Sequence, residues 1–298
     1  MAEGDSPTVA RRRVRLAVRE ARELADLTQA QVAEEMEWSL SKVIRIENGD
    51  VSISPNDLRP LLNYLGVRDK AMTTSLIADA RLARTRQTAW YQTPEFRENL
   101  TDSLRKLTEY ENEATQIRSY TIYYVPGPLQ TPAYSQALMT RFEDELNESQ
   151  RELRIEARRR RREALLTRTK ADRVRVYVMF DEGVLRRSIG GPTVFAEQLR
   201  EIRRLAEEHL IMVRMVPFSL DASLTNNASF DLLVLGEGEV LYRETGLNDE
   251  MIEDRDTAAK HRARYEKVWH EAATEEETLD FISDQIRTLE TGNTGRRR

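Results

Sequence analysis

The chain of 298 residues contains no cysteine. Disulfides, zinc–thiolate sites and cysteine nucleophiles are therefore excluded. Histidine is also scarce: only His209, His261 and His270 occur, and none has the HExxH spacing of a zinc site. We expect neither a metal nor any other cofactor.

Long apolar runs are missing as well. No stretch approaches the ~18 consecutive apolar residues that a membrane-spanning helix requires. Near the N-terminus, Arg11, Arg12 and Arg13 precede an amphipathic stretch rather than a continuously apolar one, which does not fit a signal peptide. We expect a cytoplasmic protein without a membrane partner.

An excess of positive charge is also absent. The chain has 46 Lys and Arg against 51 Asp and Glu, a net charge of -5, which argues against indiscriminate binding to a polyanion. Residues 8–70 contain 11 Lys and Arg and 10 Asp and Glu, so this segment is nearly neutral as well. Any binding to nucleic acid must therefore come from the local arrangement of side chains.

Residues 11–84 are predicted to form five short helices. Apolar residues recur at helical spacing between residues 11 and 26. Thr28, Ser39 and Ser54 each have the residue type of a helix N-cap, and Gly49 and Gly66 are suited to end helices. The fifth helix is expected between residues 69 and 84.

The rest of the chain has a mixed pattern. We predict mostly helix over residues 88–140, where Tyr110, Ala114 and Ile117 have helical spacing, and a very basic helix over 148–168. One helix is also expected over 193–208, and one or two terminal helices over 249–290. Four runs rich in β-branched residues predict strands, the last two joined by a hairpin at 236–239: Val174–Phe180, Ile211–Val216, Phe230–Leu235 and Val240–Tyr242.

These patterns predict a mostly α protein with an α+β C-terminal part. The expected organisation is a disordered tail over 1–10, a small helical domain over 11–84, a larger domain with a mixed sheet over 88–290, and a disordered tail over 291–298.

Residues 28–49 resemble the helix-turn-helix of the phage-repressor family, the Cro-type or XRE-type regulators. Ala33 is small where two helices must cross closely, Ile46 is apolar where the recognition helix meets the core, and Glu47-Asn48-Gly49 matches the closing signature of the family. The resemblance implies a five-helix, lambda-repressor-like domain in a transcriptional regulator that binds double-stranded DNA. The alternative is an ordinary helical packing motif with a solvated polar face.

The helical pattern turns one set of side chains outward, where they fit the major groove: Ser39, Leu40, Ser41, Lys42 and Arg45. Arg45 lies one turn from Ser41 and is suited to a bidentate contact with guanine. We expect Lys42 to meet phosphate and Leu40 to make apolar contact. By resemblance, Gln29 is expected to bind a backbone phosphate.

Several other positions matter for this domain. The resemblance implies that Arg22 and Glu47 form a partly buried ion pair that holds the fold. Glu37 stands at a turn position where the family often has glycine, and Trp38 is interpreted either as packing on the turn or as contacting sugar-phosphate. Residues 11–13 are interpreted either as an arm that contacts phosphates or as a solvated tail.

The C-terminal part resembles the antitoxin-like regulators of actinomycetes, whose C-terminal domain has no agreed activity. An ordered series of residues carries this resemblance: Val125-Pro126-Gly127-Pro128-Leu129-Gln130-Thr131, Tyr134, Arg162-Glu163-Ala164-Leu165-Leu166, Asp181-Glu182, Leu185-Arg186-Arg187, Gly190-Gly191-Pro192, Gln198-Leu199, Pro217, Phe230, Tyr242 and Glu244. It implies transcriptional control, often beside a small acidic partner protein.

We do not expect an enzyme. Asp181 and Glu182 are adjacent, so on a strand they would face opposite sides and form no carboxylate pair; helix capping is the preferred interpretation. The arginines at 158–162 must point all around their helix. They are interpreted as solvated or paired with acids (Glu143-Asp144-Glu145 is one option), with a partner surface or phosphate contacts as alternatives.

The sequence thus predicts a homodimer that reads a palindromic operator, with a C-terminal domain for dimerisation and for sensing a small-molecule effector or binding a partner. The alternative is an antitoxin-like protein that mainly binds a small acidic protein and regulates its own operon.

Overall fold

The computed structural model describes residues 6–85, 89–140, 145–220, 228–236, 238–244 and 249–294. The chain divides into two compact units, Met1–Ala89 and Trp90–Arg298. No helix within the described ranges is long and apolar enough to cross a membrane.

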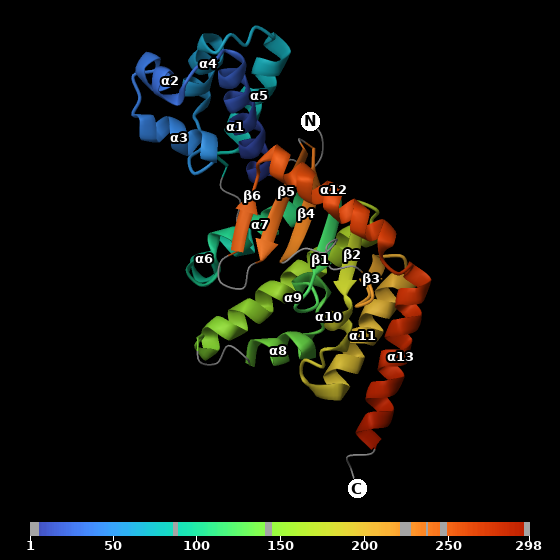
Figure 1. Cartoon of the computed structure of the whole chain (residues 1–298). Coiled ribbons are helices and arrows are strands. Elements are labelled where there is room, and N and C mark those ends of the chain that lie inside the picture. Colours follow the sequence, from blue (N-terminus) through green and yellow to red (C-terminus); the bar gives the residue numbers. More distant parts are fainter. Residues whose placement is uncertain are drawn as a thin grey trace. The chain divides into compact units, whose positions relative to one another are not determined.

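The first unit is entirely helical in its described part (Figure 1). Its helices are α1 (Pro7–Leu24), α2 (Gln29–Glu35), α3 (Leu40–Asn48), α4 (Pro55–Tyr64) and α5 (Lys70–Leu82). They enclose one apolar core, to which each helix contributes, including Val18, Val32, Ile46, Leu61 and Leu76.

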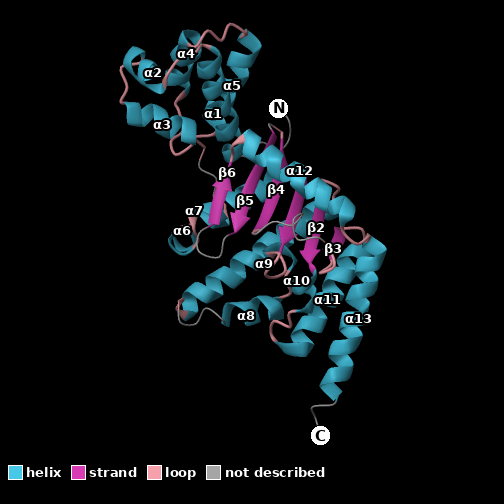
Figure 2. Cartoon of the chain, in the orientation of Figure 1, coloured by secondary structure: helices cyan, strands magenta, loops and turns pink. Residues whose placement is uncertain are grey.

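The second unit combines helices with a sheet, as Figure 2 shows by colour. Its elements are, in chain order, η1 (Trp90–Gln92), α6 (Pro94–Asn99), α7 (Asp102–Glu113), β1 (Gln116–Thr121), η2 (Gly127–Leu129), α8 (Pro132–Thr140), α9 (Glu148–Lys170), β2 (Arg175–Asp181), α10 (Glu182–Arg186), α11 (Gly191–Glu207), β3 (Met212–Val216), β4 (Ser229–Leu235), β5 (Gly238–Glu244), β6 (Asp249–Ile252), α12 (Arg255–Glu271) and α13 (Glu275–Thr294). The predicted fold class, mostly α with an α+β C-terminal part, is confirmed.

The described strands form one mixed sheet in the order β3-β2-β1-β4-β5-β6. β1, β2 and β3 run parallel, whereas β4, β5 and β6 continue from β1 as antiparallel neighbours. Helix α12 packs on one face through Tyr265 and Val268. The opposite face is covered by helices that include α8, α9, α11 and α13, with Phe195 and Leu199 among the most buried side chains.

Two strands were not predicted. β1 lies in a segment that was expected to be mostly helical, and β6 lies at the start of the predicted helix over 249–290. The helical spacing of Tyr110, Ala114 and Ile117 was misleading because Tyr110 belongs to α7 while Ile117 already belongs to β1.

The predicted tails are too long. α1 begins at Pro7 because proline is favoured at the first helical position and Ser6 Oγ accepts a hydrogen bond from Val9 N at 3.3 Å. At the other end, α13 continues to Thr294. Residues 1–5 and 295–298 lie outside the described part of the chain.

Candidate nucleic-acid interface

The link between α2 and α3 is set by local hydrogen bonds. α2 begins with a capping box in which Thr28 Oγ1 accepts from Gln31 N at 3.2 Å and Thr28 N donates to Gln31 Oε1 at 2.8 Å. The helix ends in a Schellman turn, where Trp38 N donates to Ala33 O at 2.8 Å. Ser39 then caps α3 by accepting from Lys42 N at 3.2 Å. These contacts orient α3 independently of any ligand.

Helix α3 has one buried side and one exposed side. Val43, Ile46 and Glu47 are buried, and the first two belong to the core of the unit. Four residues that were predicted to face DNA are exposed: Ser39, Leu40, Ser41 and Arg45. An exposed helix surface of this kind fits the ~12 Å major groove of B-DNA.

Lys42, the fifth residue of that group, is partly held by the protein. Its Nζ lies 3.4 Å from Asp57 Oδ2 on α4 and 3.7 Å from the centre of the Trp38 ring. Trp38 packs against the core of the unit, as one of its two interpretations required. Asp57 was not predicted to take part, because its position beside Lys42 depends on how α4 packs.

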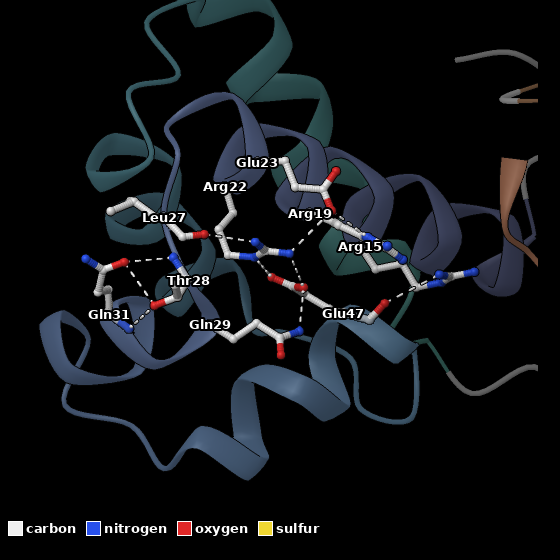
Figure 3. A network of polar contacts seen from close by, with 9 residues as sticks. All are labelled: Arg15, Arg19, Arg22, Glu23, Leu27, Thr28, Gln29, Gln31 and Glu47. Carbon is white, nitrogen blue, oxygen red and sulfur yellow. Dashed lines mark hydrogen bonds and ion pairs between the residues drawn. The ribbon is translucent and has the colours of Figure 1, made fainter. Parts of the chain in front are cut away.

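Arg22 and Glu47 form a bidentate ion pair between α1 and α3 (Figure 3). Arg22 Nε lies 2.7 Å from Glu47 Oε1, and Arg22 Nη2 lies 3.0 Å from Glu47 Oε2. The hydrogen bond with Glu47 raises the pKa of Arg22. Arg22 Nη1 also donates to Leu27 O at 2.9 Å, so the same side chain holds the end of α1 to the start of α2.

Gln29 joins this network, a role that the sequence analysis missed. Its Nε2 donates to Glu47 Oε2 at 2.8 Å (Figure 3). An amide nitrogen has two N–H donors, so one remains for the expected phosphate. Nothing in the sequence pairs Gln29 with Glu47, because the contact depends on the crossing of α2 and α3.

Arg11, Arg12 and Arg13 do not form a flexible arm; all three belong to α1. Arg11 Nε donates to Ser52 Oγ at 2.8 Å, and Arg13 Nη1 pairs with Asp79 Oδ1 at 2.9 Å. These residues therefore lie on a helix and not in a flexible arm or a solvated tail, whereas their contact with phosphate stays a prediction. A phosphate contact by Arg11 or Arg13 would have to compete with these intramolecular contacts.

In the second unit, the basic run on α9 is largely paired within the chain. Arg159 and Arg160 pair with Glu156, Arg161 with Glu111, and Arg162 with Glu201. The pairing agrees with the preferred interpretation. Glu143 and Asp144, named as one option, lie outside the described residues.

The adjacent acids at the end of β2 also have structural partners. Asp181 caps α10 by accepting from Gly183 N at 2.8 Å. Glu182 Oε2 accepts from Phe218 N at 2.8 Å and its Oε1 pairs with Arg186 at 2.6 Å. Both carboxylates therefore stabilise the local fold.

Comparison with protein families agrees with this geometry. Residues 14–76 match the family described as a helix-turn-helix domain, so the first unit belongs to a class of DNA-binding domains. Residues 104–284 match the family described as domain of unknown function DUF5753. The chain belongs to the DUF5753 family. No curated protein and no solved structure matches it significantly.

Proposed function

We propose that the chain is an XRE-type transcriptional regulator that binds double-stranded DNA sequence-specifically through α3. The observation that carries the proposal is the exposure of Ser41 and Arg45 on one side of α3 while Val43 and Ile46 fix the other side in the core. The side chain of Arg45 has no hydrogen bond or ion pair with the described residues, so its guanidinium is available for a base edge. The chain acts in this proposal by binding and not by catalysis.

The test measures binding of the full chain to sites selected from genomic fragments. Arg45→Ala is expected to weaken binding to the selected site by ~1–3 kcal/mol and to relax the preference at one base position. Arg59→Ala is the matched control, because Arg59 is an exposed arginine on α4. Equal losses for Arg45→Ala on selected and random duplexes, or no preference of the wild type for any duplex at moderate salt, would refute the proposal.

We also propose that the chain acts as a homodimer on a palindromic operator. A single domain of this size buries only ~600–1,000 Å² on DNA, which rarely gives specific affinity alone. Two recognition helices then enter successive major grooves ~34 Å apart. Half-sites at that spacing, together with sedimentation of a two-chain species, are the expected result; a single half-site bound by one chain contradicts it.

In this proposal the C-terminal unit supplies the dimer interface and a surface for sensing or partner binding. The antitoxin-like alternative, with a small acidic protein partner, receives less support, because four arginines of the run on α9 already pair with Glu156, Glu111 and Glu201. Purification of the chain from its native cells separates the two functions. A small protein present in equal amounts would favour the alternative.

A further inference from the structure

The second unit contains a cavity of about 950 Å³. This volume lies at the upper end of the ~300–1,000 Å³ typical of sites for small organic molecules. Its lining is formed entirely by residues of the second unit, between Asn99 and Asp249. Part of the lining is apolar: Leu100, Leu104, Leu107, Leu138, Met139 and Ile189.

A basic wall of the cavity is formed by α9. Arg154, Arg158 and Arg161 all line it, and their spacing of four and three residues places them on one side of the helix. Arg161 is already neutralised by Glu111, at 2.7 and 2.8 Å. Neither Arg154 nor Arg158 has an ion pair within the described part of the chain.

Arg158 is left incompletely satisfied. Its Nη1 donates to Arg154 O at 3.1 Å and approaches Met139 Sδ at 3.6 Å, but its Nε is buried without a hydrogen-bond partner. Burial lowers the pKa of Arg158 to about 10, which still leaves the guanidinium charged at neutral pH. The nearby Glu244 raises this pKa and so offsets part of the cost of burying the cation, and an anion in the cavity would offset more of it.

Four described carboxyl groups line the cavity, and none of them forms an ion pair with Arg154 or Arg158: Glu145, Asp231, Glu244 and Asp249. Two of the four accept hydrogen bonds from hydroxyl groups of the chain. Ser119 Oγ donates to Asp231 Oδ1 at 2.5 Å, and the Tyr124 hydroxyl donates to Glu244. Burial raises the pKa of Asp231 to about 7 and also raises the pKa of Glu244, so both are less charged than exposed carboxyls.

We infer that this cavity is a binding site for a small amphipathic organic anion. The acidic group of the ligand pairs with Arg158 and Arg154, and its apolar body lies against the leucines and Met139. The site deepens the sensing role proposed above by assigning it a place and a ligand class. The test of ligand binding requires no DNA, so a negative result for the cavity can be distinguished from a negative result for DNA binding.

The probe is 8-anilinonaphthalene-1-sulfonate, an aromatic sulfonate whose fluorescence rises in apolar sites, titrated into the full chain. The neutral control probe is N-phenyl-1-naphthylamine, which lacks the sulfonate. We expect saturable binding of one sulfonate probe per chain. Arg158→Met and Arg154→Met are each expected to weaken it at least ~10-fold, the scale of one lost charge-assisted hydrogen bond, with little effect on the neutral probe.

Arg159→Met is the matched control, because Arg159 lies on the same helix, is half exposed and pairs with Glu156 and Glu163. Thermal melting establishes that each variant folds. If Arg158→Met does not fold, Arg154→Met and the charge-conserving Arg158→Lys, which is expected to retain binding, decide the outcome. Absence of saturable binding in the wild type, or equal affinity of the Arg154 and Arg159 variants, would overturn the inference.

Discussion

Arg22 on α1 and Glu47 on α3 meet in a two-point ion pair with N–O distances of 2.7 and 3.0 Å. The Glu47 side chain is only 3% exposed, so its charge depends on these contacts for compensation. The pair connects the first helix of the domain to the helix that is proposed to read DNA. Stability of the fold and presentation of α3 are therefore coupled.

The first prediction concerns this pair. Arg22→Ala is expected to lower the free energy of unfolding of the first unit by ~2–4 kcal/mol, because it leaves a buried carboxylate with Gln29 as its remaining side-chain donor. Urea unfolding followed by circular dichroism measures the loss. Arg19→Ala is the control, since Arg19 and Glu23 form an exposed pair expected to contribute less than ~1 kcal/mol. Equal stabilities of the two variants would contradict the prediction.

The second prediction concerns Glu37 in the turn before α3. Its φ is +54°, a left-handed conformation that costs a non-glycine residue ~1–2 kcal/mol. Glu37→Gly is expected to stabilise the first unit by up to ~1 kcal/mol, because part of the relief is lost to the greater chain entropy of glycine. It also removes an acidic side chain beside the proposed interface and so is expected to increase DNA affinity.

Thermal melting and DNA titration test this prediction. Glu34→Gly is the control, since Glu34 is exposed within α2 and glycine there is expected to cost ~1 kcal/mol. A Glu37→Gly variant that melts below the wild type would show that the turn is not strained.

The third prediction concerns Gly49, which ends α3 with φ of +82°. A Cβ atom at this position would lie 2.9 Å from Cδ of Arg15. Gly49→Ala is therefore expected to cost more than the ~1–2 kcal/mol of left-handed strain alone. Gly66→Ala provides the comparison, because Gly66 has φ of +78° and no atom within 4 Å of its Cβ position. Urea unfolding measures the free energy of unfolding of both variants. If Gly49→Ala and Gly66→Ala lose equal amounts, the Arg15 side chain moves away from the added Cβ atom at no cost.

The fourth prediction concerns the pH dependence caused by Asp231. Burial raises the pKa of Asp231 from 3.8 to about 7, so the folded state binds the proton more tightly than the unfolded state. The contribution of this group to stability is therefore present below its ordinary pKa and is lost as the pH rises toward 7. Asp231→Asn is expected to flatten the decline in melting temperature between about pH 4 and about pH 7, where each kcal/mol of stability corresponds to ~2–4 °C.

Asp280→Asn on the exposed side of α13 serves as the control for that series. It is expected to keep the wild-type slope of melting temperature against pH. If Asp231→Asn keeps the wild-type slope as well, Asp231 is ionised in the folded protein.

The boundaries of α2, α3 and α4 follow from the sequence because they depend on local chemistry, whereas the start of α1 at Pro7 was missed. The predicted N-caps each accept a hydrogen bond from a backbone N–H three residues further on: Thr28, Ser39 and Ser54. Gly49 ends α3 by adopting a left-handed backbone conformation, as predicted. The contact between Gln29 and Glu47 could not be predicted in this way, because it joins residues on two different helices.

The missed strand β1 shows the limit of periodicity. It lies in the middle of the sheet and is buried on both faces, with Ile117 in one core and Tyr120 in the other. Most of its residues are nevertheless polar, so it lacks the apolar run that would identify such a strand: Gln116, Arg118, Ser119 and Thr121. β6 was missed for another reason: it is a short strand at the edge, identified only by its pairing with β5.

By itself, the sequence determined the helix-turn-helix with its caps, the exposed residues of α3 and the class of the C-terminal fold. These properties follow from interactions between near neighbours in the chain. Only the tertiary structure decided which arginines pair with which carboxylates, where β1 lies, and that Arg158 lines a cavity without forming an ion pair among the described residues. Those facts depend on the packing of segments far apart in sequence, because a buried charge finds its partner on another segment only after the two segments have packed together.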